Sequence, residues 1–344
     1  MKPSTVYYYK NVKNLKACYN KFFSMITEEV DVEEKIGIKI HFGAQNNDTH
    51  IDPKQLKDIK KYFKRPIFVE SNCLYPVHRH RSDEHIKIAH EHGFDFLPID
   101  ILDGDVGLDY EEIEINTKNT KKALMSIGLR DYDNLISIAH FKGHITTGFS
   151  GALKNLGMGL GSRGGKMDIH AGVSPRVNAD KCTACGICAE ECIAEAIDVS
   201  DYAIIDPTKC IGCAMCIAVC PERIIRVPMR NRTTNEFLEK VVEYAYAGIM
   251  GHNWWFINAL TNITMKCDCM RIKQEPFMDD IGIHYSTDPI AIDQASIDLV
   301  IMKNSLVNPF NVNHKTNQQI LKYGEKLGLG KRDYVLEYMS DCKV

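Results

Sequence analysis

The strongest constraint on this sequence is a run of cysteines between Cys182 and Cys220. The pattern Cys-x2-Cys-x2-Cys-x3-Cys occurs twice in this run, and its members are Cys182, Cys185, Cys188, Cys192, Cys210, Cys213, Cys216 and Cys220. Cysteines at this spacing hold cubane [4Fe–4S] clusters, because three thiolates two residues apart converge on one centre. The alternatives are a disulfide scaffold or two zinc sites, but zinc knuckles rarely carry two successive Cys-x2-Cys steps. The run therefore predicts two [4Fe–4S] clusters and a role in electron transfer.

The spacing also predicts which cysteines share a cluster. The fourth cysteine of each run comes a helical turn after the other three and is expected to ligate the other cluster. One cluster is then assigned to Cys182, Cys185, Cys188 and Cys220. The second cluster is assigned to Cys210, Cys213, Cys216 and Cys192.

Composition narrows the class of protein. The 344 residues include 42 basic and 45 acidic side chains, so a net charge of −3 favours neither nucleic acid nor an anionic membrane as a partner. No apolar stretch reaches the ~18 residues of a membrane span, so none is expected. Most of the 13 cysteines are assigned to clusters rather than disulfides, and a reducing cytoplasm is the expected location. Oxygen-labile clusters suggest an anaerobic host.

Strands and helices alternate outside the cysteine run. Strands are expected at 35–42, 66–70, 94–99, 112–115, 135–139, 254–258, 262–264 and 281–283. Helices are expected at 53–63, 82–92, 120–127, 235–249 and 289–300. This alternation predicts an α/β fold with a mixed or parallel sheet flanked by helices. We expect a ferredoxin-like two-cluster domain at 177–228, inserted between two parts of the α/β domain, 1–176 and 229–344.

Candidate catalytic residues follow two of the predicted strands. They are Lys39, His41, His140 and Lys142. The stretch 140–159 is expected to be a basic, glycine-rich loop whose backbone N–H groups attract an anion. Its candidate cofactor-binding residues are Gly143, Gly148, Gly151, Lys154 and Asn155. Open α/β sheets bind ligands at the carboxyl ends of their strands, so these residues are predicted to form one site. The alternatives are a packed connection for the loop and solvated surface charges for the lysines.

Cys267 and Cys269 form a second cysteine site. On an extended chain two residues separated by one other face the same way, so both thiols can address one metal or ligand. A disulfide between them would be strained. Soft thiolates suit iron, zinc or copper(I). A redox-active or substrate-binding role, and two buried structural cysteines, are the alternatives.

Several separate motifs together resemble one known family. They are the runs Lys39–Gly43, Phe141–Gly159, Cys267–Cys269, Asp280–Gly282 and Ser286–Asp293. They resemble the family called domain of unknown function 362, whose members often carry a ferredoxin insert at this place. The resemblance implies an α/β domain interrupted by a two-cluster ferredoxin, and it assigns no reaction.

Two functions of different classes follow from these residues. The first is an iron–sulfur oxidoreductase that passes low-potential electrons to a substrate or metal centre in the α/β domain. The second is an electron carrier or metallocentre-assembly protein without substrate turnover. The expected partners are a ferredoxin, flavodoxin or reductase, and a small-molecule substrate. No nicotinamide fingerprint occurs, and a flavin stays open because flavin sites often lack a short motif.

Overall fold

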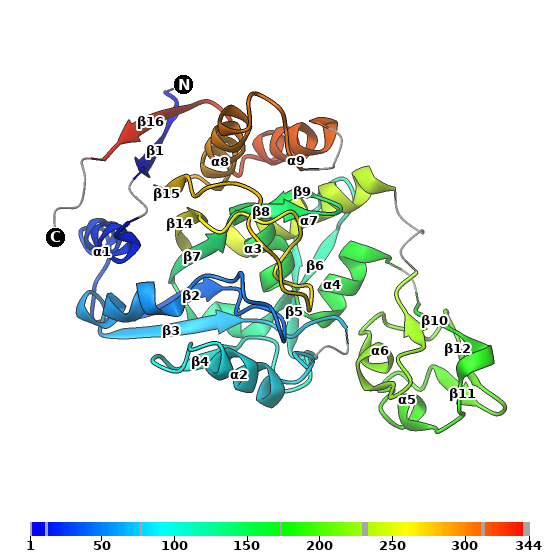
Figure 1. Cartoon of the computed structure of the whole chain (residues 1–344). Helices are drawn as coiled ribbons and strands as arrows, with labels where there is room; N and C mark the ends of the chain where they lie inside the picture. The colour runs from blue at the N-terminus through cyan, green and yellow to red at the C-terminus, as the bar shows by residue number, and fades with distance from the viewer. Residues whose placement is uncertain are drawn as a thin grey trace.

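A mixed sheet of eight strands forms the centre of the computed structural model (Figure 1). The structure describes residues 2–10, 13–75, 78–172, 174–228, 233–310 and 314–339. In spatial order the strands are β16 (Tyr334–Tyr338), β1 (Ser4–Tyr9), β15 (Gly282–Ser286), β14 (Asn253–Leu260), β7 (Asn134–His140), β2 (Lys35–Ile40), β3 (Arg65–Glu70) and β4 (Ile99–Ile101). The five strands from β14 to β4 are parallel, whereas β15 is antiparallel to both neighbours. The predicted mixed α/β sheet is confirmed.

Helices cover both faces of the sheet, which explains why its central strands are apolar throughout. Every residue of β7 is buried, as expected for a parallel strand covered on two sides. One face packs against α1 (Leu15–Ile26), the 3₁₀ helix Pro53–Lys61 and α2 (Ser82–Glu91). The other face packs against α3 (Ala152–Leu160), α7 (Thr234–Ile249), α8 (Pro289–Lys303) and α9 (His314–Leu327).

Local sequence signals begin two of these helices. The Asp288 carboxylate accepts hydrogen bonds from the N–H groups of Ile290 and Ala291, and Pro289 occupies the first turn of α8. Thr233 caps α7 by accepting a hydrogen bond from the Glu236 N–H, in the Thr-x-x-Glu arrangement of a capping box. Both helices therefore begin where the sequence predicts.

The cysteine-rich segment, residues 177–228, lies at one end of the molecule (Figure 1) and packs around a separate apolar core, to which Leu74, Met167 and Ala171 of the α/β part also contribute. Its elements and the strand leading into it are β10 (Arg176–Val177), a 3₁₀ turn (Ala179–Lys181), α5 (Ile187–Glu190), β11 (Ile197–Val199), β12 (Ala203–Ile205), α6 (Met215–Val219) and β13 (Ile225–Arg226). Helix α4 (Arg163–His170) precedes it. Strands β14 and β15 follow it and join the sheet that contains β7. The start of the second α/β part at residue 229 lies outside the described residues.

The predicted helix at 120–127 is wrong. This stretch forms β6 (Lys122–Ser126), which pairs with β5 (Tyr110–Glu114) in a separate two-stranded sheet. Ala123 and Met125 are fully buried while Lys122 is exposed, so the burial has the period of a strand. Two other strands also differ: the one expected at 94–99 forms later, as β4, and 262–264 forms no strand.

The stretch 140–159 is more regular than the predicted loop. It contains a hairpin of β8 (Lys142–His144) and β9 (Gly148–Ser150), and then α3. The Asp293 carboxylate of α8 accepts hydrogen bonds from the first N–H groups of α3, on Ala152 and Leu153. Such a cap from a distant helix offsets the poor helix propensity of the glycines. No helix among the described residues is long and apolar enough to cross a membrane.

Candidate functional site

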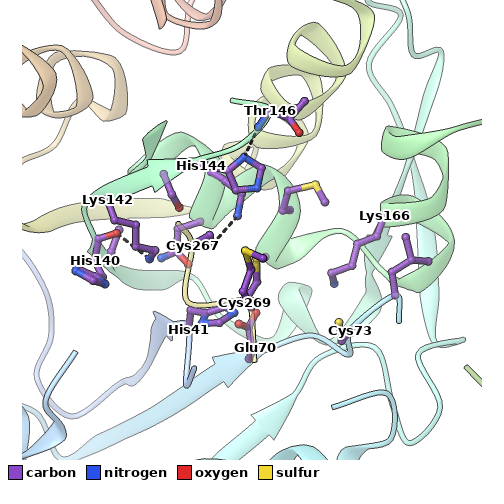
Figure 2. Close-up of a pocket in the computed structure, with 18 of the residues that line it drawn as sticks. His41, Glu70, Cys73, His140, Lys142, His144, Thr146, Lys166, Cys267 and Cys269 are labelled. Carbon is purple, nitrogen blue, oxygen red and sulfur yellow. Dashed lines mark hydrogen bonds between the residues drawn. The ribbon is translucent and has the colours of Figure 1, made fainter. Parts of the chain in front are cut away.

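A cavity of about 360 Å³ opens at the carboxyl ends of β2, β3 and β7 (Figure 2). Helices α3 and α4, the β8–β9 hairpin and the loop that carries Cys267 and Cys269 complete its walls. Ligands in open α/β sheets bind at this edge, because the loops that leave parallel strands meet there. The structure therefore gathers several predicted site residues in one cavity: Lys39, His41, His140, Lys142, Gly151, Lys154, Asn155, Cys267 and Cys269.

Lys39 lies at the cavity floor in a closed ion pair. Its Nζ is 2.8 Å from Glu70 Oε1 and 3.0 Å from Asn155 Oδ1, and the side chain has no exposed surface. Burial lowers the pKa of Lys39, and the Glu70 charge opposes that effect. A Cβ on Gly159 would lie 2.5 Å from Lys39 Nζ. The absence of a side chain at Gly159 thus lets α3 approach this lysine.

Asp268 anchors the loop between the two cysteines. Its carboxylate lies 2.8 Å from His140 Nδ1 and 2.7 Å from Lys142 Nζ. Thr49 also donates to it at 2.9 Å. Burial opposes the charged carboxylate, but the charges of His140 and Lys142 outweigh burial and hold the pKa of Asp268 well below its usual range. Asp268 therefore fixes the positions of Cys267 and Cys269 on either side of it.

His140 and His41 have their ring nitrogens engaged by neighbouring groups. His140 Nε2 lies 2.9 Å from the Thr261 carbonyl, so both of its nitrogens face hydrogen-bond acceptors. His41 Nδ1 accepts a hydrogen bond from the Gly43 N–H, and its Nε2 lies 3.1 Å from Arg79 Nη1. These contacts favour a positioning role for His140 and leave His41 beside a positive charge.

Cys267, Cys269 and His144 meet at one point of the cavity. One ligand atom of each lies within 4.8 Å of the others. Lys154 Nζ lies 3.6 Å from Cys267 Sγ. A hydrogen bond from Cys269 and the charges of Lys154 and Lys142 lower the pKa of Cys267 well below 9, against the effect of burial. The hydrogen bond and the two lysine charges therefore favour the thiolate form of Cys267.

Two backbone groups fix the tautomer of His144. Its Nδ1 accepts hydrogen bonds from the N–H groups of Thr146 and Thr147 at 3.2 and 3.1 Å. In the neutral imidazole the proton then sits on Nε2. Figure 2 shows the ring between Thr146 and the two cysteines, so the protonated nitrogen faces the sulfur atoms. His144 is thus a hydrogen-bond donor toward the cavity in this arrangement.

The eight cysteines of the cysteine-rich segment form two groups. Cys182, Cys185, Cys188 and Cys220 line one small cavity. A second small cavity is lined by Cys192, Cys210, Cys213 and Cys216. Backbone N–H groups of Ala203 and Ala196 point to the sulfur atoms of Cys182 and Cys192 at 3.4 and 3.3 Å. Four converging thiols with N–H donors fit a [4Fe–4S] cluster in each group, in the interleaved pairing that the spacing predicts.

A family model described as "Domain of unknown function (DUF362)" matches residues 36–298, more than half of the chain. This chain belongs to the DUF362 family. The family description names no reaction, so any activity has to come from the site itself.

Other similarities of this DUF362 protein are partial. It is 43% identical over 47 residues to a subunit of the ion-translocating oxidoreductase complex of Methanosarcina acetivorans, a match that covers 13% of this chain and 18% of that one. The lactate racemase apoprotein from Thermoanaerobacterium thermosaccharolyticum has a TM-score of 0.40 at 10% identity, over 83% of this chain and 54% of that one. A Thermotoga maritima protein has a TM-score of 0.37 at 11% identity, over 90% and 59% of the two chains. The DUF362 chain thus spans less than two thirds of each.

The cysteine-rich segment of this DUF362 protein touches the wall of the main cavity. Leu74 lines the cavity and also belongs to the apolar core that contains Cys216 and Cys220, and Tyr75 lines the cavity and packs against that core. The buried guanidinium of Arg163, on α4, places Nη1 3.1 Å from Met215 Sδ. The two parts of the molecule therefore share a wall.

Sequence reasoning missed four residues of this DUF362 site: Arg79, His144, Lys166 and Asp268. Arg79 lies in a charged loop that reads as solvated surface, although its side chain is buried. Asp268 stands between two candidate cysteines, and that position in the sequence could have identified it as a site residue.

Gly143 and Gly148 belong to the β8–β9 hairpin and are not among the described lining residues, so their cofactor-binding role stays a prediction.

Proposed function

We propose that this protein is an iron–sulfur reductase that passes electrons from two [4Fe–4S] clusters to a small molecule in the main cavity. The proposal rests on the wall that the main cavity shares with the cysteine-rich segment. Leu74 lines the cavity and belongs to the apolar core that contains cysteines of both groups, Cys188, Cys216 and Cys220, and Tyr75 lines the cavity and packs against that core. When bound, the clusters would supply single electrons at low potential.

The two cysteine groups differ in position in a way that suits this direction of flow. Cys185 of the first group is exposed, which favours contact with a ferredoxin, flavodoxin or reductase. The second group lies against α4. Gly164 of this helix is so close to Cys213 that a Cβ on Gly164 would lie 3.8 Å from Cys213 Cα. The match to part of an oxidoreductase complex supports electron transfer in general terms.

The cavity also carries groups for the proton side of a reduction. His144 presents Nε2–H to the cavity, and Cys269 holds a proton beside the Cys267 thiolate, which raises the pKa of Cys269 well above 9. His144 is neutral, because burial holds its pKa well below 6.5, so it can donate a hydrogen bond to an anionic product, whereas Cys269 can give up its proton. We therefore assign the proton-donor role to Cys269 rather than to His140 or His41, the candidate catalytic histidines of the sequence.

A metal centre at Cys267 and Cys269 is the second candidate function, and the convergence with His144 favours it. Two thiolates and an imidazole suit zinc or iron. Metal binding at His144 Nε2 would have to displace its proton, while the Thr146 and Thr147 N–H groups keep Nδ1 unprotonated. A metal-assembly role therefore requires this hydrogen-bond pair to break.

Metal and sulfide content of anaerobically purified protein tests the proposal. About eight irons and eight acid-labile sulfides per chain are expected, because each cubane holds four of each. Cys216→Ser should lose about half of the iron, whereas Cys18→Ser, a buried cysteine of the sheet core, should lose none. Wild-type protein with zinc in place of iron would contradict the proposal.

The double variant Cys267→Ser/Cys269→Ser separates the two candidates. A further metal that is present in the wild type and lost only in this variant favours the metal centre. If the double variant keeps the metal content of the wild type but its reduced form no longer turns over substrate, the reductase is favoured.

A further inference from the structure

The charges that line the main cavity do not balance among the described residues. The basic lining side chains are Lys39, Arg79, Lys142, Lys154 and Lys166, and the lining carboxylate is Glu70. Four of these five cations are buried, and Lys154 is partly exposed. A buried charge without a partner is costly, so the partner of each cation matters.

Two of the five cations pair with a carboxylate of the protein. Lys39 pairs with Glu70 at 2.8 Å, and Lys142 pairs with Asp268 at 2.7 Å. Lys154 is partly exposed and lies 3.6 Å from the sulfur of Cys267. Lys39 and Lys142, the candidate catalytic lysines of the sequence, are therefore already neutralised.

Arg79 and Lys166 have no such neighbour. Arg79 is 4% exposed, and its Nε has no hydrogen-bond partner among the described residues. Lys166 is 8% exposed, and its Nζ donates to two uncharged oxygens, Ser71 Oγ at 2.5 Å and the Gly161 carbonyl at 2.6 Å. Asp103 acts on Lys166 only through space, and burial raises the pKa of that carboxyl, which disfavours its charged form. No carboxylate of the described chain forms an ion pair with either side chain.

Arg79 and Lys166 both line the main cavity. Burial holds the pKa of His85 well below 6.5, and the charges of Arg79, Lys166 and Lys39 lower it further. His85 is itself fully buried. Since Lys39 is already paired with Glu70, a net excess of about two positive charges remains there.

We propose that the cavity binds a small dianion through Arg79 and Lys166. Arg79 offers a planar fork that fits a carboxylate or phosphate, and Lys166 offers a point charge in the same cavity. The cavity of about 360 Å³ is near the lower end of the ~300–1,000 Å³ range of ligand pockets, so the ligand is small. A dicarboxylate and a phosphate share this chemistry. The inference rests on the proposed function, in which this dianion is the electron acceptor.

Calorimetric titration of the anaerobic full-length protein tests the inference with three probes. Succinate and inorganic phosphate are the dianions, and acetate is the matched monoanion. Both Arg79→Gln and Lys166→Gln should weaken the preferred dianion at least tenfold, which is about 1.4 kcal/mol each. Tighter binding of succinate assigns a dicarboxylate, and tighter binding of phosphate assigns a phosphate compound. Dianions that bind no tighter than acetate, or equally well to both variants, overturn the inference.

Two controls keep the test clear of folding effects. Lys122→Gln removes an exposed lysine of β6 and should leave all three affinities unchanged. Lys166→Met removes a buried, unpaired charge and should raise the melting temperature of the ligand-free protein. A lower melting temperature for Lys166→Met would mean that the protein itself compensates this charge, against the inference.

Binding is measured without a reductant, so the inference and the proposed function fail separately. Succinate and phosphate cannot be reduced by iron–sulfur clusters, so their binding tests the inference alone, whereas the metal and sulfide content tests the proposed function. Electron transfer to an uncharged acceptor, with no dianion binding, contradicts the inference.

Discussion

At the scale of residues, the site is organised by Asp268 rather than by the cysteines beside it. Asp268 binds His140 and Lys142, and its backbone carbonyl accepts a hydrogen bond from the Ala44 N–H at 2.9 Å. These contacts join β2, β7 and the cysteine loop at one point. A single carboxylate thereby sets where the Cys267 thiolate lies.

Asp268→Asn should destabilise the protein by about 3–5 kcal/mol, because it leaves Lys142 and His140 without a buried counter-charge. Urea unfolding at neutral pH measures this loss. Glu112→Gln breaks an exposed pair with Lys122 and should cost less than about 1 kcal/mol. A loss for Asp268→Asn as small as the loss for Glu112→Gln would show that the charges are already screened by water.

The difference in unfolding free energy between wild type and Asp268→Asn should also depend on pH. The pKa of Asp268 is well below its unfolded value of about 4, so its ionised form stabilises the fold above that pH. This contribution is lost as pH falls toward the folded pKa. The difference in unfolding free energy between wild type and Asp268→Asn should therefore shrink below about pH 4. A difference that stays constant down to pH 3 would contradict the assignment.

At the scale of elements, α3 carries the cavity wall because its glycines allow close packing. A Cβ on Gly157 would lie 2.1 Å from the Val241 carbonyl of α7, and one on Gly151 would lie 2.2 Å from Asp293 Oδ1. The Val241 carbonyl is part of the backbone of α7, and Asp293 is held by its hydrogen bond from the Ala152 N–H, so neither group can move away easily. The glycine-rich character of 140–159 is therefore explained by helix packing as well as by access to a ligand.

Gly157→Ala tests this packing. The clash with backbone of α7 should cost roughly 1–3 kcal/mol, more than the ~1 kcal/mol that alanine gains in a helix. Gly164→Ala is the matched control on α4, because its Cβ would make only ordinary contacts, from 3.4 Å outward. Thermal unfolding of the two variants should give a lower melting temperature for Gly157→Ala alone. Equal melting temperatures would mean that α3 and α7 separate at little cost.

At the scale of the whole molecule, the proposed electron transfer depends on how the cysteine-rich segment meets α4. Arg163 lies at this contact, bonded to Met215 Sδ and to the His80 carbonyl. Its guanidinium is buried, and burial lowers its pKa despite the charges of Asp103 and two nearby cysteines. The second group of cysteines is thus held close to the cavity by a residue that ligates nothing.

Arg163→Met should keep the iron and sulfide content but slow the oxidation of reduced protein by the cavity ligand at least tenfold. The physical reason is a looser contact between the segment and α4, which lengthens the path for electrons. Anaerobic stopped-flow measurement of cluster absorbance follows the rate. Arg226→Gln, at an exposed position of β13, should leave the rate unchanged. Equal rates in all three proteins would contradict this role of Arg163.

The sequence alone determined the cysteine groups and most of the parallel sheet. Short-range signals carry this information: the spacing of Cys182 to Cys220, the buried run of β7, and the caps at Thr233 and Asp288. The residue types at the ends of β2 and β7 also predicted where the site lies, because parallel strands bring their carboxyl ends together.

Only the tertiary structure decided the chemistry of the cavity. Whether a lysine binds a ligand depends on its partner, and the partner of Lys142 is Asp268, 126 positions away. Arg79 and Lys166 have the composition of surface residues and become important only because folding buries them unpaired. The strand at 122–126 likewise depends on pairing with β5. Charge compensation and strand pairing are properties of distant contacts, which local sequence patterns do not contain.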